Sequence, residues 1–185
     1  MCTVTIHRSE TGFAVTMNRD EAFVRAPERR PEICTTGSGV DWIAPFDGEK
    51  GGTWMGVNTL GVAAGLLNAY QPGESLLPGA TGPHRTRGEI VAAVLEAGDG
   101  AAAREWVERS LDAARYPSFT LLLVTPTESL GYEWLGRAAA QRAVNLDNPW
   151  ALRASSGWDS VEVIRWREER LAQALAAGAA HEDTL

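Results

Sequence analysis

Cys2 is the residue at the start of this chain whose type and position could do chemistry. An initiator methionine is usually removed when a small residue follows it, and loss of Met1 would leave a thiol and a free α-amine on one residue. The ordinary pKa of such an amine is about 7.7 to 8.0 and that of a thiol about 8.5. The amine can therefore act as a general base for its own thiol near neutral pH, although a cysteine in a terminal strand is often only a small buried hydrophobe.

The strand pattern predicts two charged partners for Cys2. Residues 2–7 alternate with a period of two, residues 9–12 are typical of a turn, and residues 13–17 form a second strand of the same hairpin. Arg19 lies at the end of that second strand, where its guanidinium would favour the thiolate and lower the thiol pKa. Asp20 would hold the α-ammonium through a charge-assisted hydrogen bond.

The rest of the pattern predicts sheets covered by helices. Further strands are expected at 53–57, 61–67, 119–124, 130–135, 138–146 and 151–154, helices at 87–97, 101–114 and 161–177, and loops at 27–41 and 71–82. Groups of strands alternate with groups of helices, and there is no regular βαβ repeat. This order favours layered sheets within one domain spanning residues 1–185.

Composition excludes several classes of partner. The 185 residues carry a net charge of −7, which disfavours binding to nucleic acid. No apolar run is long enough for stable membrane insertion. Cys2 and Cys34 belong to no zinc-binding pattern, so no metal and no cofactor are expected, and both thiols fit a reducing, cytoplasmic location. The sequence leaves open whether the chain forms a homo-oligomer.

Several segments together resemble the NRDE family, the family of transport and Golgi organization protein 2. They are MCTVTIH at 1–7, MNRDE at 17–21, GGTWMGVNTLGVAAGLLNAYQP at 51–72, RGEIV at 87–91 and YPSFTLLLV at 116–124. Any one of these segments alone would be a weak signal, whereas their joint occurrence in this order is specific. The resemblance covers most of residues 1–125.

The resemblance implies an α+β fold, a four-layer αββα sandwich of two mainly antiparallel sheets. This is the fold of the N-terminal nucleophile hydrolases, including choloylglycine hydrolase and penicillin V acylase. In those enzymes an Arg and an Asp flank the N-terminal Cys, as Arg19 and Asp20 would here. Asn68 resembles their oxyanion donor, a role worth about 3 kcal/mol in comparable sites.

The resemblance also implies substrate-binding positions around Cys2. These are Asn18, Trp54, Asn58, Ser155 and Ser156. Ser155 or Ser156 stands where the hydrolases carry another Asn, and Arg165 is only a guess for their last Arg. Trp54 fits a tryptophan packed within a strand equally well.

Two functions are compatible with this resemblance. The first is a cysteine amidohydrolase that cleaves a small linear amide other than a peptide bond, with Cys2 as nucleophile after removal of Met1. The second is a non-catalytic binding or trafficking protein for haem, acyl-CoA or another lipid, since family members have been linked to such ligands. The residues at the nucleophile end favour the enzyme.

Overall fold

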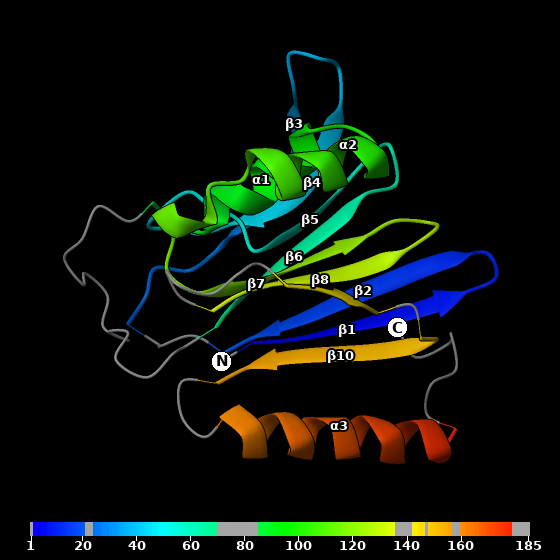
Figure 1. Cartoon of the computed structure of the whole chain (residues 1–185). Helices are drawn as coiled ribbons and strands as arrows, with labels where there is room; N and C mark the ends of the chain where they lie inside the picture. Colours follow the sequence, from blue (N-terminus) through cyan, green and yellow to red (C-terminus); the bar gives the residue numbers. More distant parts are fainter. Residues whose placement is uncertain are drawn as a thin grey trace.

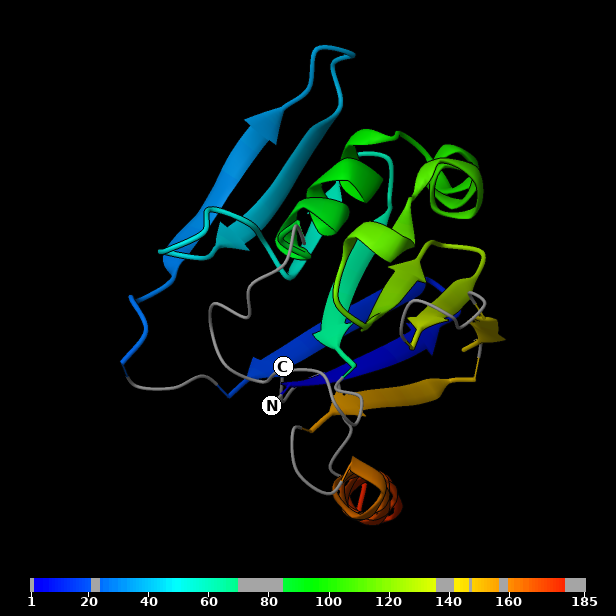
Figure 2. The same ribbon diagram turned by 60° about the vertical axis from the view of Figure 1, so that its left-hand side comes forward.

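The computed structural model of this chain describes residues 2–20, 24–69, 85–135, 142–146, 148–156 and 160–178. These residues form two antiparallel sheets that lie face to face between helices (Figure 1). Helices α1 and α2 cover the larger sheet, and α3 covers the outer face of the smaller one (Figures 1 and 2). The four-layer αββα sandwich expected from the sequence is confirmed.

The smaller sheet carries the start of the chain and has the strand order β10–β1–β2. Its strands are β1 (Cys2–Ser9), β2 (Gly12–Arg19) and β10 (Trp150–Ser155). Cys2, Val4 and Ile6 are buried against the larger sheet because alternate side chains of a strand point to the same face. The predicted hairpin is confirmed, and its register places Cys2 opposite Arg19.

The larger sheet has the order β3–β4–β5–β6–β7–β8–β9. Its strands are β3 (Arg29–Thr35), β4 (Asp41–Phe46), β5 (Met55–Asn58), β6 (Ala63–Asn68), β7 (Phe119–Val124), β8 (Ser129–Trp134) and β9 (Arg142–Asn145). The interpretation of 27–41 as a loop is wrong for residues 29–35, which form the edge strand β3. Ile33 in this strand is 74% exposed, so no alternation of buried and polar residues marks β3 in the sequence.

The first predicted helix is confirmed as α1 (Gly88–Glu96), whose apolar stripe is fully buried. The second, predicted as one helix over residues 101–114, is divided into three parts. It comprises α2 (Gly100–Glu105), one π-helical turn η1 (Trp106–Ser110) and a separate 3-10 turn η2 (Ala113–Arg115). The chain leaves the helix at Leu111, which has an extended backbone, and Ala113 and Tyr116 then turn back into the core.

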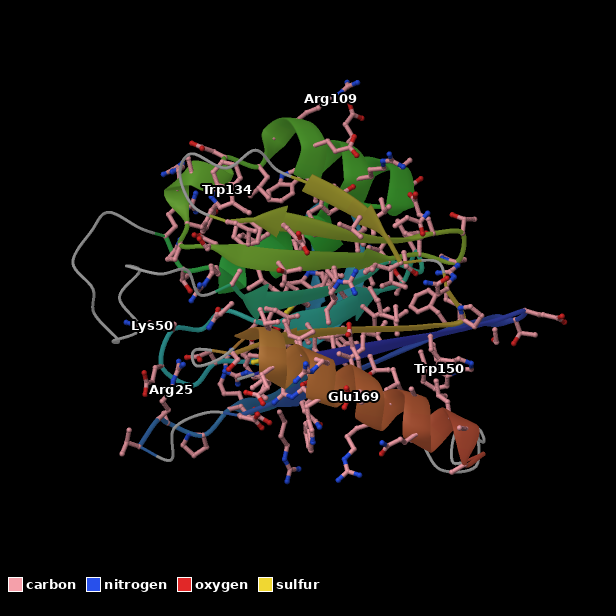
Figure 3. All side chains as sticks on the ribbon, turned by 60° about the horizontal axis from the view of Figure 1, so that its bottom comes forward. Arg25, Lys50, Arg109, Trp134, Trp150 and Glu169 are labelled. Atoms are coloured by element: carbon pink, nitrogen blue, oxygen red, sulfur yellow. The ribbon has the colours of Figure 1, made fainter. Side chains whose placement is uncertain are left out.

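The third predicted helix is confirmed as α3 (Ser160–Ala176), which packs on β10. Its inward positions include Ile164, Leu171 and Leu175, all of them half-buried. Its outward side carries Glu169 in Figure 3. Because α3 lies directly over the strand beside β1, side chains on its inner face can reach the start of the chain.

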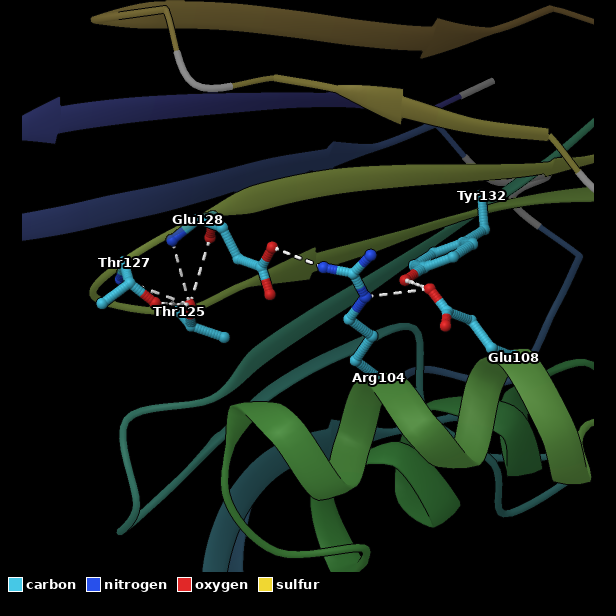
Figure 4. Close-up of polar contacts among 6 residues, drawn as sticks. All are labelled: Arg104, Glu108, Thr125, Thr127, Glu128 and Tyr132. Carbon is cyan, nitrogen blue, oxygen red and sulfur yellow. Dashed lines mark hydrogen bonds and ion pairs between the residues drawn. The ribbon is translucent and has the colours of Figure 1, made fainter.

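A polar network fastens α2 and η1 to the β7–β8 hairpin (Figure 4). Arg104 contacts Glu108 at 2.9 Å and Glu128 at 3.1 Å, and the Tyr132 hydroxyl donates to Glu108 at 3.3 Å. Burial raises the pKa of Tyr132, and the Glu108 carboxylate adds to this effect, so the phenol stays protonated and keeps donating. The network holds the helical layer on the face of the larger sheet that points away from Cys2.

Two apolar cores separate these layers. One lies between the helices and the larger sheet, and it contains Trp42, Leu66, Ile90 and Leu121. The other lies between the two sheets, and it contains Cys2, Val4, Ile6, Ala63, Leu67, Leu122, Val124, Leu146 and Ala151. Cys2 therefore stands at the start of the central strand of the small sheet, at the edge of the core between the sheets.

Candidate active site

Cys2 lies between two of the predicted site residues. The antiparallel registers pair Cys2 with Arg19 of β2 on one side and with Ser155 of β10 on the other. Directly opposed residues in antiparallel strands present their side chains on the same face, about 5 Å apart. Cys2 is 9% exposed and packs in one cluster with Leu67 of β6. Its side chain thus faces the space between the sheets.

Ser155 contacts the nitrogen of the candidate nucleophile. The Cys2 backbone N–H donates to Ser155 Oγ at 3.3 Å. Ser155 is 6% exposed and Ser156 is 2% exposed, so both hydroxyls are buried beside the first residue of β1. The structure therefore brings Ser155 to the atom that would become the α-amine after removal of Met1.

Arg19 is held by an aromatic face. Its guanidinium carbon lies 3.6 Å from the centroid of the Trp54 ring, and Glu28 Oε2 lies 3.5 Å from Nη1. The Arg19 side chain is only 16% exposed. The charge of Arg19 is thus confined beside the strand end that carries Cys2. No feature of the sequence predicts the contact between Arg19 and Glu28.

A second arginine, Arg167 of α3, reaches the backbone of Cys2 from the outer face of the small sheet. Its Nη1 donates to the Cys2 carbonyl oxygen at 3.1 Å and also donates to the Thr3 hydroxyl, while its Nη2 lies 3.3 Å from Asp20 Oδ2. Its side chain is only 15% exposed. Arg167 therefore ties β1, the end of β2 and α3 together, and it places Asp20 within this contact.

Sequence reasoning missed Arg167, although a signal was present. Arg167 lies three residues after Ile164 and four before Leu171, so it shares their inward face of the helix. A charged residue on an inward face indicates a buried partner. The guessed residue, Arg165, instead points to the exposed side, where it lies 3.9 Å from Glu169.

The structure does not bring Asn18 and Asn58 to Cys2. Asn18 pairs with Thr3 and is exposed, one residue out of phase with Arg19. Asn58 is 5% exposed and faces the helices. Its amide nitrogen donates to the carbonyls of Leu95 and Gly98 at 2.9 and 2.7 Å. Its Oδ1 accepts from the N–H groups of Leu60 and Val62 at 3.0 and 2.9 Å. These four bonds give Asn58 a structural role between α1 and the β5–β6 turn.

Asn68 lies at the end of β6, opposite Phe119 of β7. Leu67 before it packs in the cluster that contains Cys2, so by strand alternation Asn68 falls in phase with Leu66 and Phe119, which pack on the helix side. Asn68 is half-buried, so its amide is partly accessible at this end of the sheet. Its role as an oxyanion donor stays a prediction.

A clamp of opposite charges fastens the chain after Asp20 to the β4–β5 turn. Arg25 Nη2 lies 2.6 Å from Asp47 Oδ2, and the Ala26 N–H donates to Glu49 at 3.1 Å. Figure 3 shows Arg25 beside the turn that carries Lys50. Partial burial favours a raised pKa for Asp47, but the backbone N–H groups of Lys50 and Glu49 and the charges of Arg25 and Arg19 outweigh it and leave the pKa below its ordinary value.

Asp47→Asn is expected to lower the free energy of unfolding at pH 7 by about 1 kcal/mol, because it removes the charge that holds Arg25. A carboxyl with a depressed pKa stabilises the fold above its unfolded pKa of about 3.9, and it loses this effect as the pH falls through the lower folded value. The deficit should therefore persist at pH 5 and be smaller at pH 2.5. Urea midpoints at the three pH values measure it.

The matched control for Asp47 is Glu32→Gln, which removes an ion pair in which Arg29 and Glu32 are 54% and 51% exposed. Its urea midpoint should stay at the wild-type value at each pH, because exposed pairs contribute little. An Asp47→Asn deficit that is absent at pH 7, or that persists unchanged at pH 2.5, would contradict the role assigned to this clamp.

The sequence matches one known protein family over nearly its whole length. A sequence model described as "Transport and Golgi organisation 2" matches residues 1–177 of the 185. The chain belongs to this family. The match extends past the motifs of the first 125 residues and includes β10 and α3, which carry Ser155 and Arg167. The resemblance to the NRDE family is thereby confirmed.

A solved amidase structure shares the fold of this Transport and Golgi organisation 2 family member. An N-acylethanolamine-hydrolyzing acid amidase ortholog from Caenorhabditis elegans aligns with a TM-score of 0.59 at 10% identity, over 87% of this chain and 73% of that chain. Penicillin V acylase from Agrobacterium tumefaciens aligns with a TM-score of 0.49 at 14% identity, over 100% of this chain and 59% of that chain. At these identities the likeness shows the fold alone.

No protein with a curated description matches the chain. Within the described ranges, none of the helices has the length and apolar character needed to span a bilayer. In the same part of the chain, His, Cys, Asp and Glu side chains form no group of three or more that could hold a metal ion.

Proposed function

We propose that this chain is a cysteine amidohydrolase that cleaves a small linear amide other than a peptide bond, with Cys2 as its N-terminal nucleophile. The observation that carries the proposal is the position of Cys2 in register between Arg19 and Ser155, with its nitrogen 3.3 Å from the Ser155 hydroxyl. A nucleophile needs a nearby base and a group that favours its anionic form. The α-amine left by removal of Met1 and the Arg19 guanidinium supply these two functions.

The first half of the reaction transfers the acyl group to Cys2. The α-amine, oriented by Ser155, takes the thiol proton, and the thiolate attacks the amide carbonyl carbon. As the C–S bond forms, the carbonyl electrons move onto oxygen, where Asn68 donates a hydrogen bond to the oxyanion. When this intermediate collapses, the C–N bond breaks and the α-ammonium gives its proton to the leaving amine. The products are a free amine and a thioester on Cys2.

The second half of the reaction regenerates the thiol. The α-amine removes a proton from water, and the resulting hydroxide attacks the thioester carbonyl. The C–S bond breaks, the ammonium returns a proton to sulfur, and a carboxylic acid is released. Arg167 and Asp20 take no part in the bond changes. Arg167 holds the Cys2 backbone by donating to its carbonyl oxygen, and Asp20 accepts from the other end of the same guanidinium, so that the sulfur and nitrogen stay aligned.

The substrate class follows from the chemistry of the site and from the fold. Such a site needs only a carbonyl carbon and a leaving amine, and the structural neighbour from Caenorhabditis elegans is described as hydrolysing N-acylethanolamines. We therefore assign this chain an acyl amide of a small amine. No observation on the described residues favours the alternative of a carrier for haem, acyl-CoA or another lipid.

Hydrolysis of a panel of amides with increasing acyl length tests this function. Purified protein is incubated with N-acylethanolamides and N-acyl amino acids of increasing acyl length, and the released amine is quantified. At least one member should release amine above the protein-free rate. Acid quenching during turnover should trap one acyl group on Cys2 by intact mass. No amine release and no acyl adduct across the panel would contradict the proposal.

A further inference from the structure

We propose that Trp54 is a positioning residue that fixes the Arg19 guanidinium beside Cys2 and thereby sets the pH at which the Cys2 thiol becomes reactive. This inference rests on the proposed function, because it concerns the same nucleophile. It assigns Trp54 a role different from lining a substrate pocket or simply filling the core.

The first observation is the geometry of the contact. The guanidinium carbon of Arg19 lies 3.6 Å from the Trp54 ring centroid, well within the distance of about 6 Å at which a cation is attracted to an aromatic face. Arg19 is directly opposed to Cys2 in the β1–β2 register and only 16% exposed. Without such a contact, a side chain with this many rotatable bonds would populate several conformations. The indole therefore restricts Arg19 to the side of the sheet that Cys2 faces.

The second step concerns the part of a guanidinium that an aromatic ring contacts when the guanidinium carbon lies over it, as it does here. A guanidinium carries its five N–H donors in its plane, and stacking occupies its flat face instead. Trp54 can thus hold the charge in place without competing for hydrogen bonds. The in-plane groups remain those that meet acceptors, as Nη1 does with Glu28 at 3.5 Å. A thiolate on Cys2 would be one more acceptor at this edge.

The third observation is that the segment carrying Trp54 is itself fixed. The Thr53 N–H donates to the Gly88 carbonyl at the start of α1 at 3.2 Å, and the Leu66 N–H of β6 donates to the Trp54 carbonyl at 2.8 Å. A Cβ on Gly52 would lie 2.9 Å from Gly88 Cα, so the two backbones meet at a distance that only glycine permits. The backbone that carries the indole is therefore fixed by β6 and α1, independently of Arg19.

Other charged groups lie around Cys2 and Arg19, and the test must leave them unchanged. Among the described residues they are Arg19 and Asp20 at the end of β2, Arg25 and Glu28 after it, Asp47 in the β4–β5 turn, Arg87 before α1 and Arg167 of α3. Trp54 just before β5, Asn68 of β6 and Ser155 of β10 do not ionise near neutral pH. Arg153 of β10, opposite Val4, and the Cys2 α-amine left by removal of Met1 are present in every variant. Substitution of Trp54 changes none of these charges, so a change in pH dependence reports on position alone.

The test measures the rate of iodoacetamide alkylation at Cys2 against pH, by peptide mass mapping that separates Cys2 from Cys34. We compare wild type, Trp54→Leu, Trp54→Phe and Arg19→Gln. Trp54→Leu should move the midpoint to higher pH, towards that of Arg19→Gln, and slow alkylation at pH 7 by roughly 3- to 10-fold. Trp54→Phe keeps a smaller ring and should lie between wild type and Trp54→Leu. A residue that only filled space would leave the midpoint unchanged.

Trp166→Leu is the matched control. Trp166 is also contacted by an arginine, with Arg170 5.4 Å from its centroid, but this pair lies on the exposed side of α3 and Trp166 is 55% exposed. Its substitution should leave the Cys2 midpoint at the wild-type value. If Trp54→Leu does not fold, Trp54→Phe decides alone by the presence or absence of its intermediate shift.

The outcomes separate this inference from the proposed function. A raised midpoint in Arg19→Gln with a wild-type midpoint in both Trp54 variants overturns the role of Trp54 and leaves the nucleophile intact. A wild-type midpoint in Arg19→Gln as well overturns both the inference and the role of the guanidinium. A Cys2 that no pH makes reactive overturns the proposed function.

Discussion

An Asn58→Ala variant is expected to unfold with a free energy about 3 kcal/mol below that of the wild type. The truncation leaves two backbone carbonyls and two backbone N–H groups without the partners that the Asn58 amide supplies at 2.7 to 3.0 Å. Buried groups without partners cost about 1 to 3 kcal/mol each, reduced where water reaches them. The loss should also loosen α1 from the β5–β6 turn, because Leu95 and Gly98 lie at the end of that helix.

Urea unfolding followed by circular dichroism measures this loss for Asn58. The matched control is Asn18→Ala, which removes the same side chain from an exposed position of β2 and should stay within about 0.5 kcal/mol of the wild type. Equal midpoints for Asn58→Ala and wild type would show that the amide is not the structural tie described above.

Cys2→Ala is expected to abolish amide hydrolysis, with a loss of about a thousand-fold or more, because no other group can form the thioester. The fold should persist, since alanine keeps a small apolar side chain at the edge of the core between the sheets. The measurement is amine release from the best substrate of the panel, together with the thermal midpoint of each variant.

Cys34→Ala is the control for the loss of a thiol away from the candidate site. Cys34 lies in β3 on the helix side of the larger sheet, opposite Trp42 in register, so its removal should leave turnover at the wild-type rate. Hydrolysis that survives in Cys2→Ala, or that disappears in Cys34→Ala while the fold persists, would place the nucleophile elsewhere.

The sequence predicts the nucleophile end of this fold well because short-range patterns determine it. The alternation in residues 2–7 and the turn at 9–12 are enough to fix the β1–β2 register, and that register alone places Arg19 opposite Cys2. The buried stripe of α1 likewise follows from its helical periodicity. These features depend on residues no farther apart along the chain than Cys2 and Arg19.

Features that depend on distant partners were not predictable in the same way. β3 is stabilised by pairing with β4 while its own side chains stay exposed, so its composition is typical of a loop. Ser155 and Arg167 meet Cys2 across more than 150 residues. Asn58 has the residue type of a binding site, but its surroundings make it a structural residue, and only the three-dimensional arrangement distinguishes the two.

The most direct test of the central claim is the intact mass of the purified protein before and after iodoacetamide at pH 7. We expect a chain without Met1 that gains one carbamidomethyl group, on Cys2. Burial raises the pKa of the Cys34 thiol, and the charges of Glu32 and Glu96 raise it further, so Cys34 should react only at higher pH. A folded, active protein that retains Met1, or one alkylated at Cys34 before Cys2, would contradict the claim.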